Sequence, residues 1–213
     1  MNEPTSTAPV PGLAASNPGD RTQRPRVRHG FMYWFGRAWL GMHGWELVGE
    51  RPACRKCIVI GAPHTSNWDL PFSLAIAGVL GFQLHWLGKE SLFKFPMGWL
   101  MRHLGGIAIE RSGNNRIVER VVREFNGRED LCLAVAPEGT RGKSSRWKTG
   151  FYHMAVGAGV PIQLAFLDYG KKRGGMGPLL QPTGDLEADV AQMRAFYQGV
   201  KGRRPECQGD VEL

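Results

Sequence analysis

Apolar and polar positions alternate along the chain so that strands and helices are predicted in turn from about residue 45. Short apolar runs rich in β-forming residues are typical of buried strands, and they lie at 45–48, 57–60, 83–87, 107–109, 131–136 and 162–167. Helical patterns separate them, at 68–80, 97–104, 114–126 and 148–158. A last helix is predicted from the capping residue Asp185 to about residues 199–202. This alternation predicts an α/β fold: a single domain with a mostly buried mixed sheet flanked by helices.

Residues 29–44 precede this pattern and predict an amphipathic helix. Its apolar side chains recur at helical spacing directly after a cluster of arginines, as Phe31, Trp34, Phe35, Trp39 and Met42. Aromatic rings at the headgroup level with cations toward anionic lipid are typical of a helix that lies in a membrane interface. The run is too short to span a bilayer, which takes about 20 apolar residues. A helix docked on the core of the domain is the alternative, and both can hold together.

The flanking segments complete the predicted organisation. Residues 1–28 are rich in Pro, Ser, Thr and Ala, with almost nothing to bury, and are expected to form a disordered leader. Residues 45–202 are expected to form the folded domain, and residues 203–213 a polar tail.

Composition and charge narrow the classes of function. The chain has 213 residues, enough for one domain with a sizeable core, and a formal net charge of +8. Such charge suits an anionic membrane surface or a nucleic acid, but no recognised nucleic-acid-binding motif accompanies it. The four cysteines form neither a disulfide framework nor a zinc site, because the pair at 54 and 57 has no second pair at ligand spacing.

Two short segments carry the candidate chemistry, Pro-His-Thr-Ser-Asn-Trp-Asp at 63–69 and Ala-Pro-Glu-Gly-Thr-Arg at 136–141. Each directly follows a predicted strand, and α/β folds place the ligand crevice at the carboxyl ends of their strands. Five residues on one helix would leave His64 and Asp69 about 140° apart. We therefore expect His64 on the loop and Asp69 in the first helical turn, folded back toward it.

A carboxylate in that position accepts one imidazole N–H and leaves the other nitrogen free to take a proton. A histidine with a purely structural role is the alternative. In the second segment, Glu138 and Arg141 lie three residues apart around Gly139, which lets the backbone approach a ligand. A base beside a guanidinium suits transfer of an acyl group onto a phosphorylated alcohol.

The order of these segments resembles the glycerolipid acyltransferase family, which includes the 1-acylglycerol-3-phosphate acyltransferases of bacterial phospholipid synthesis. The segment 64–69 is similar to the family's His-x4-Asp block, and 136–141 to its third block. Further similarity is found at 89–99 (Lys-Glu-Ser-Leu-Phe-Lys-Phe-Pro-Met-Gly-Trp), 105–111 (Gly-Gly-Ile-Ala-Ile-Glu-Arg) and 160–162 (Val-Pro-Ile). The matching segments run in order across residues 57–167.

The resemblance implies a role for each matching residue. His64 is expected to be the general base and Asp69 the group that orients it. The acceptor phosphate is expected to be held by Arg111, Glu138, Gly139, Thr140 and Arg141, with Lys89 as a further substrate-binding residue.

The expected reaction is O-acyl transfer from acyl-CoA or acyl-carrier protein to the hydroxyl of a lysophosphatidate-like acceptor, giving phosphatidate in phospholipid biosynthesis. No metal or cofactor is expected, because His64 lacks a second His or Cys at ligand spacing. The expected location is peripheral, on the cytoplasmic face of the cell membrane. The expected partners are an anionic membrane surface, the acyl donor and a lysophospholipid acceptor, with no nucleic acid.

Two other classes of function stay open. One is an N-acyltransferase or an acyl thioesterase acting on a non-phosphate acceptor, in which His64 activates an amine or water. The other is a non-catalytic basic module that binds membranes, which would leave the spacing of His64 and Asp69 without a purpose.

Overall fold

One mixed sheet organises the chain. A computed structural model describes residues 30–109, 114–144, 146–209 and 211–212, and the elements named below are those of this described part. Seven strands lie in the order β1-β7-β6-β2-β5-β3-β4, and each neighbouring pair is parallel except β6 and β7. The strands are β1 (Glu46–Val48), β2 (Lys56–Ala62), β3 (Leu84–Lys89), β4 (Gly106–Ile109), β5 (Leu131–Val135), β6 (Ile162–Asp168) and β7 (Arg173–Leu180). The predicted α/β fold with a mixed sheet is confirmed.

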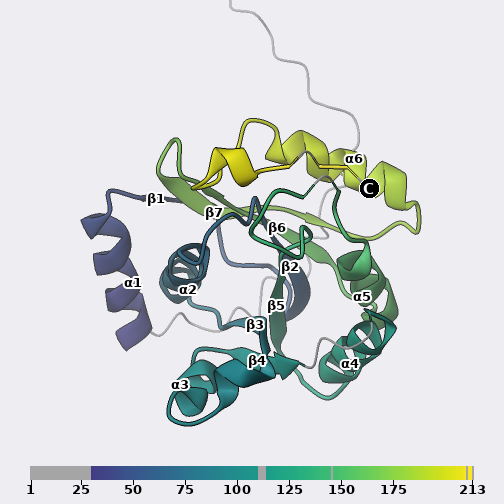
Figure 1. Cartoon of the computed structure of the whole chain (residues 1–213), viewed down its shortest axis with the longest axis horizontal. Helices are drawn as coiled ribbons and strands as arrows, with labels where there is room; N and C mark the ends of the chain where they lie inside the picture. Colours follow the sequence, from purple (N-terminus) through teal and green to yellow (C-terminus); the bar gives the residue numbers. More distant parts are fainter. Residues whose placement is uncertain (1–29, 110–113, 145, 210, 213) are drawn as a thin grey trace, which may run out of the picture.

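Helices cover both faces of this sheet. They are α1 (Phe31–Met42), α2 (Asp69–Leu80), α3 (Gly98–His103), α4 (Asn114–Asn126), α5 (Gly150–Ala158) and α6 (Leu186–Tyr197), with short 3₁₀ turns η2 (Glu90–Phe93) and η3 (Pro205–Cys207). Figure 1 shows α1 and α2 on one side of the sheet and α4 and α5 on the other. The predicted cap at Asp185 is present, since its carboxylate accepts a hydrogen bond from the Ala188 amide at the start of α6.

Strand β2 lies near the middle of the sheet and is buried on both faces. Cys57 and Val59 belong to the apolar cluster that includes α1 and α2. The alternate residues, Ile58 and Ile60, belong to the cluster formed with α4, α5 and α6. Successive side chains of a strand point to opposite faces, so this continuous apolar run fills two cores at once.

The eight residues of β7 were not expected to form a strand, because they read Arg-Gly-Gly-Met-Gly-Pro-Leu-Leu and glycine and proline disfavour strands. Close packing explains Gly177, where a Cβ atom would lie 2.3 Å from the ring of Phe196. The pairing of β6 with β7 is irregular between Gln163 and Ala165. There the Gln163 side-chain amide donates to the Gly177 carbonyl at 2.7 Å. Tertiary packing therefore overrides local propensity in β7.

Helix α1 forms where an amphipathic helix is predicted and docks on α2. The two helices touch through their backbones: a Cβ atom on Gly36 would lie 2.5 Å from the Ala75 carbonyl oxygen. The opposite face is open, with Phe31 79% and Trp34 64% exposed. Of the helices in the described ranges, none combines the length and apolar character needed to cross a bilayer. The docked arrangement therefore coexists with an exposed aromatic face.

The segment after residue 202, which the sequence predicts as a polar tail, packs on the domain. Its Gln208 side chain bridges the chain, accepting from the Gly202 amide at 3.0 Å and donating to the Val200 carbonyl at 2.8 Å. The Arg204 amide donates to Thr65 Oγ1 at 3.1 Å. These contacts are made by backbone groups, a side-chain amide and a hydroxyl, so polar residues are enough to hold the segment.

The burial of two leucines in the sheet predicts that replacing each by alanine lowers the stability of the fold by very different amounts. Leu133 on β5 is 0% exposed and Leu179 on β7 is 37% exposed. We expect Leu133→Ala to lower the free energy of unfolding by about 2–5 kcal/mol, because it removes transfer free energy and leaves a cavity. Leu179→Ala should cost less than about 1.5 kcal/mol. Urea denaturation measures both, and equal losses would contradict the described core.

Candidate active site

The candidate residues gather at one edge of the sheet. His64 follows the end of β2 at Ala62, and Glu138 follows the end of β5 at Val135. These two strands are hydrogen-bonded neighbours and run parallel, so their carboxyl ends meet at the same edge. Two segments about seventy residues apart in the sequence are thereby placed side by side, as the strand pattern predicts.

His64 and Asp69 form the expected pair. Nδ1 of His64 lies 2.9 Å from Oδ2 of Asp69, with the histidine side chain 29% exposed and the aspartate side chain 7% exposed. Asp69 is the first residue of α2, as predicted. Because Nδ1 is bound to the carboxylate, Nε2 is the nitrogen left to accept a proton.

The carboxylate of Asp69 is held by its surroundings as well as by the histidine. Oδ2 accepts from the backbone amides of Thr65 at 3.1 Å and Ser66 at 3.0 Å. Oδ1 accepts from the Tyr169 hydroxyl at 2.8 Å. The Ser66 hydroxyl is engaged locally, because its oxygen accepts from the Trp68 amide at 3.2 Å. The loop is therefore folded around Asp69.

Glu138 contacts the same loop from the other segment. Its Oε1 accepts from the backbone amide of His64 at 3.1 Å. Its Oε2 is buried and has no hydrogen-bond partner among the described residues. Burial raises the pKa of Glu138, and the nearby Asp69 carboxylate adds to the rise. Glu138 thus fixes the position of the His64 backbone at an energetic cost.

The remainder of the second segment forms a tight turn. Gly139 has a φ of 64°, in the left-handed region that favours glycine, and the Lys148 side chain lies 3.0 Å from where its Cβ would be. Thr140 Oγ1 accepts from the Gly142 amide at 3.1 Å. Arg141 is exposed and donates from Nη1 to Oδ1 of Asn67, a residue of the His64 loop. The guanidinium therefore stands next to the histidine loop.

Lys89 and Arg111 are less closely tied to this group. Lys89 is the last residue of β3. In the sheet, β5 lies between β2 and β3, so Lys89 is at the same carboxyl-terminal edge as His64 but two strands away from β2. At the usual strand spacing this is about 10 Å. Arg111 lies outside the described residues. The structure brings together His64, Asp69, Glu138 and Arg141, with Gly139 and Thr140 in the connecting turn.

Three contacts of the site lie outside the sequence predictions. Tyr169 bonds to Asp69, Asn67 bonds to Arg141, and the guanidinium carbon of Arg203 lies 5.0 Å from the ring centre of Trp68. Tyr169 follows directly on β6, so the rule that placed His64 at a strand end would also have selected it. Nothing in the pattern around Arg203 marks it, because it comes from the predicted tail.

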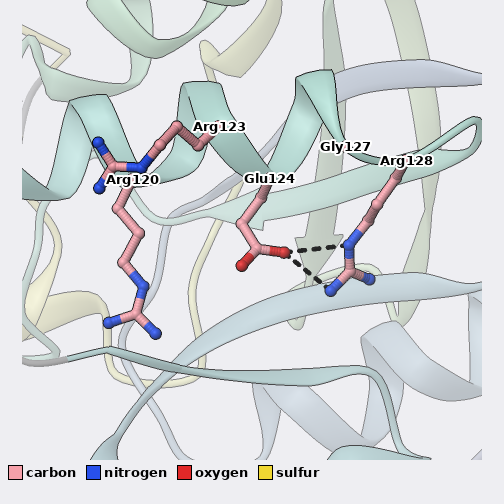
Figure 2. Close-up of a pocket in the computed structure, with 5 residues that line it drawn as sticks. All are labelled: Arg120, Arg123, Glu124, Gly127 and Arg128. Carbon is pink, nitrogen blue, oxygen red and sulfur yellow. Dashed lines mark hydrogen bonds and ion pairs between the residues drawn. The ribbon is translucent and has the colours of Figure 1, made fainter.

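The described residues contain no group of three or more His, Cys, Asp or Glu side chains that could hold a metal ion. A pocket of about 520 Å³ lies elsewhere, lined by Arg120, Arg123, Glu124, Gly127 and Arg128. Figure 2 shows Glu124 bridging to Arg128, with the Arg120 and Arg123 side chains spreading from the same helix. It adjoins the last turn of α4, and β5 begins just beyond it. The pocket is therefore at the opposite edge of the sheet from His64.

Comparisons with a family model and with individual known proteins both point to acyltransferases. A family model described as acyltransferase matches residues 46–164, which include the histidine loop and the second segment. The 1-acyl-sn-glycerol-3-phosphate acyltransferase of Haemophilus influenzae is 30% identical over 140 residues, 61% of this chain and 56% of that protein. The protein of the same name from Salmonella typhimurium is 34% identical over 134 residues, 54% of this chain and 52% of that protein. The chain spans about half the length of these relatives.

A solved structure supports the fold. The crystal structure of the 1-acyl-sn-glycerophosphate acyltransferase of Thermotoga maritima is similar with a TM-score of 0.57 and 20% sequence identity. The similarity covers 79% of this chain and 76% of that one. The α/β architecture is therefore shared across a large part of both chains.

The buried Glu138 predicts a pH-dependent gain in stability on substitution. A carboxyl whose pKa is raised on folding binds its proton more tightly in the folded chain than in the unfolded chain, where it titrates near 4.5. Its contribution to the free energy of unfolding therefore falls as the pH rises from 4.5 through the raised value. Glu138→Gln keeps an oxygen for the His64 amide and removes this fall.

The measurement is urea denaturation of both proteins from pH 4 to pH 8. We expect the difference in unfolding free energy, variant minus wild type, to grow with pH. Glu119→Gln, at an exposed position on α4, is the matched control for losing one charge. A difference for Glu138→Gln that is flat with pH, or that shrinks, would contradict the assigned environment.

Proposed function

Because this chain belongs to the acyltransferase family, whose model matches more than half of it, we propose that it transfers a fatty acyl group from acyl-CoA or acyl-carrier protein to the hydroxyl of a lysophosphatidate-like acceptor. The product would be phosphatidate. The observation that carries this proposal is the His64–Asp69 pair, 2.9 Å apart, on the loop that Glu138 and Arg141 contact from the matching second segment.

In the proposed mechanism His64 acts as the general base. Nε2 takes the proton of the acceptor hydroxyl as its oxygen attacks the thioester carbonyl, and Asp69 stabilises the imidazolium that forms. The tetrahedral oxyanion then collapses, the carbon–sulfur bond breaks and the thiolate leaves. The proton held by His64 is available to that thiolate, so the step balances without a metal or a covalent enzyme intermediate.

The acceptor phosphate is assigned to the second segment and its neighbours. Arg141 supplies a planar guanidinium beside the His64 loop, and its exposure leaves it open to a ligand. The turn at Gly139 and Thr140 lets the backbone approach that ligand. Lys89, on the same edge, and Arg111 complete the proposed substrate-binding set.

The proposed setting is the surface of an anionic membrane, on the cytoplasmic side. Helix α1 supports this, because Phe31, Trp34 and Met42 are exposed on it while Leu40 packs into the core. A lysophospholipid acceptor and its product both reside in the bilayer, so an enzyme held at the interface meets them where they are. The net charge of +8 favours anionic lipid.

The alternative functions make different demands on the site. A thioesterase needs only water beside His64, and an N-acyltransferase needs an amine, so neither requires the guanidinium that contacts the loop. A silent membrane-binding module requires none of the bonds that fix Asp69. A phosphorylated hydroxyl acceptor uses all of these features, which is why we favour it.

A thiol-release assay tests the proposed reaction. The donor is palmitoyl-CoA or a palmitoyl thioester of an acyl-carrier protein. We expect release of the free thiol to depend on lysophosphatidate and to be much weaker with monoacylglycerol, an amine or no acceptor. His64→Ala should lower kcat by about 10²–10⁴-fold, as for a lost general base. His153→Ala, at an exposed position on α5, is the control that should retain activity.

Each result of that assay decides between the functions. Release without any acceptor indicates a thioesterase, release with the amine alone an N-acyltransferase, and no release with either donor would remove the transferase proposal. Ordinary activity in the His64 variant would remove the mechanism.

Membrane contact through α1 is tested by changing its exposed ring positions. Phe31→Ser with Trp34→Ser should strongly reduce sedimentation with vesicles that contain phosphatidylglycerol, because the double variant loses apolar area that faces the bilayer. Binding of the wild-type chain should weaken as salt is raised, since part of the attraction is screened charge. The matched control, Val156→Ser with Leu179→Ser, changes exposed apolar residues elsewhere. Equal binding of the two double variants would place the contact away from α1.

A further inference from the structure

Asp69 uses its two oxygens differently. Oδ2 is shared among the His64 imidazole and the amides of Thr65 and Ser66. Oδ1 has the Tyr169 hydroxyl at 2.8 Å, and no other donor to Oδ1 is found in the part of the chain that the structure describes. Rotation of the carboxylate about its bond to Cβ would move Oδ2 away from His64. Tyr169 is therefore placed to oppose that rotation.

The position of Tyr169 is itself well determined. It follows the last residue of β6, and β6 is the parallel neighbour of β2 on the side away from β5. Its amide donates to the Lys201 carbonyl at 2.9 Å. The centre of its ring lies 4.9 Å from that of Trp45 and 5.9 Å from that of Phe72, both in edge-on contacts. The backbone and ring of Tyr169 are therefore held in place, with its hydroxyl directed at Asp69.

The segment after residue 200 adds a cation to this arrangement. The guanidinium of Arg203 lies 6.0 Å from the centre of the Tyr169 ring and 5.0 Å from that of Trp68. The next amide, of Arg204, donates to Thr65 Oγ1. Arg203 thus lies near one ring of the His64 loop and near the Tyr169 ring, at distances where cation–π attraction operates.

We propose that Tyr169 is a positioning residue for acyl transfer, acting through Asp69, and that Arg203 holds its ring in place. This inference rests on the proposed function of His64 as the base. Tyr169 keeps Oδ2 directed at His64 Nδ1, which fixes the tautomer that leaves Nε2 free for the acceptor hydroxyl. Both residues lie beyond residue 164, where the family match ends.

The hydroxyl of Tyr169 acts as a donor and not as an acid. Burial raises the pKa of Tyr169 well above its usual range, and the neighbouring Asp69 charge raises it further. The phenol therefore keeps its proton throughout the pH range in which the chain would work. The groups facing it are Asp69 from α2, Arg203 from the C-terminal segment and, through Asp69, His64.

The chain contains a matched control for a tyrosine that bonds an aspartate. Tyr152 on α5 donates to Oδ2 of Asp189 at 2.8 Å, and Asp189 is a buried residue of α6. That bond is the same length as the bond from Tyr169 to Asp69, but it joins two helices. The Tyr152 oxygen also accepts from the Gly184 amide at 2.9 Å. Tyr152→Phe therefore measures what the loss of a buried tyrosine–aspartate bond, together with that amide bond, costs the fold away from the site.

The experiment compares Tyr169→Phe and Tyr152→Phe in the full chain, with palmitoyl-CoA and lysophosphatidate varied in turn. We expect Tyr169→Phe to lower kcat on the order of tenfold, as for a lost bond to a charged group, with both KM values within about twofold. In an Asp69→Asn background the same change should alter kcat by less than about twofold, since the route through Asp69 is already lost. Tyr152→Phe should leave kcat and both KM values near wild type.

A second readout needs no substrate. In protein with ¹⁵N-labelled histidine, the ring nitrogen shifts of His64 report which nitrogen carries the proton. We expect the Nδ1–H form to dominate in the wild type and in Tyr152→Phe, and to lose ground to the Nε2–H form in Tyr169→Phe. Arg203→Met, which keeps an apolar stem of similar length, should produce a smaller change in the same direction.

These outcomes separate the inference from the proposed function. Changed His64 shifts in a chain with no transferase activity would support the positioning role and remove only the proposed reaction. Unchanged shifts in Tyr169→Phe overturn the inference, whatever the kinetics. A loss of activity that appears wholly in KM, or equally in Tyr152→Phe, also overturns it. If Tyr169→Phe does not fold, Arg203→Met carries the test, and unchanged shifts in that variant overturn the inference.

Discussion

The arrangement of the candidate site depends on one buried carboxylate. Asp69 receives the His64 imidazole, two loop amides and the Tyr169 hydroxyl, so four donors from two parts of the sheet edge converge on it. A buried carboxylate without such partners would be costly. The same bonds that offset this cost also set the direction of the histidine. The stability of the loop and the orientation of the proposed base therefore depend on the same hydrogen bonds.

Most of the fold could be predicted because its signals are local. In β2, an uninterrupted apolar run marks a strand buried on both faces, and at Asp185 a capping residue marks a helix start. The pairing of His64 with Asp69 could also be predicted, since side chains five residues apart on one continuous helix point about 140° apart, which puts His64 on the loop before the helix. These inferences need only a few neighbouring residues.

What could not be predicted depends on contacts between distant segments. The glycines of β7 argue against a strand until Phe196 is seen to occupy the space beside Gly177. Polar composition predicts a polar tail at 203–213 but not its contacts, in which the Arg204 amide bonds to Thr65 and Gln208 bridges two backbone groups. Arg203 reaches the site because this segment packs against the domain. Backbone hydrogen bonds leave no mark in residue type, so composition does not reveal them.

The close contact between α1 and α2 has a mechanical consequence. Gly36 on α1 meets the backbone of Ala75 on α2 with no room for a methyl group, and α2 begins at Asp69. The position of α1 relative to Asp69 is therefore fixed by the direct packing of α1 on α2. With the aromatic face of α1 in a bilayer, the height of His64 above the lipid would be built into the helix pair. A side chain added at residue 36 would push α1 away from α2, and would change that height without touching a catalytic group.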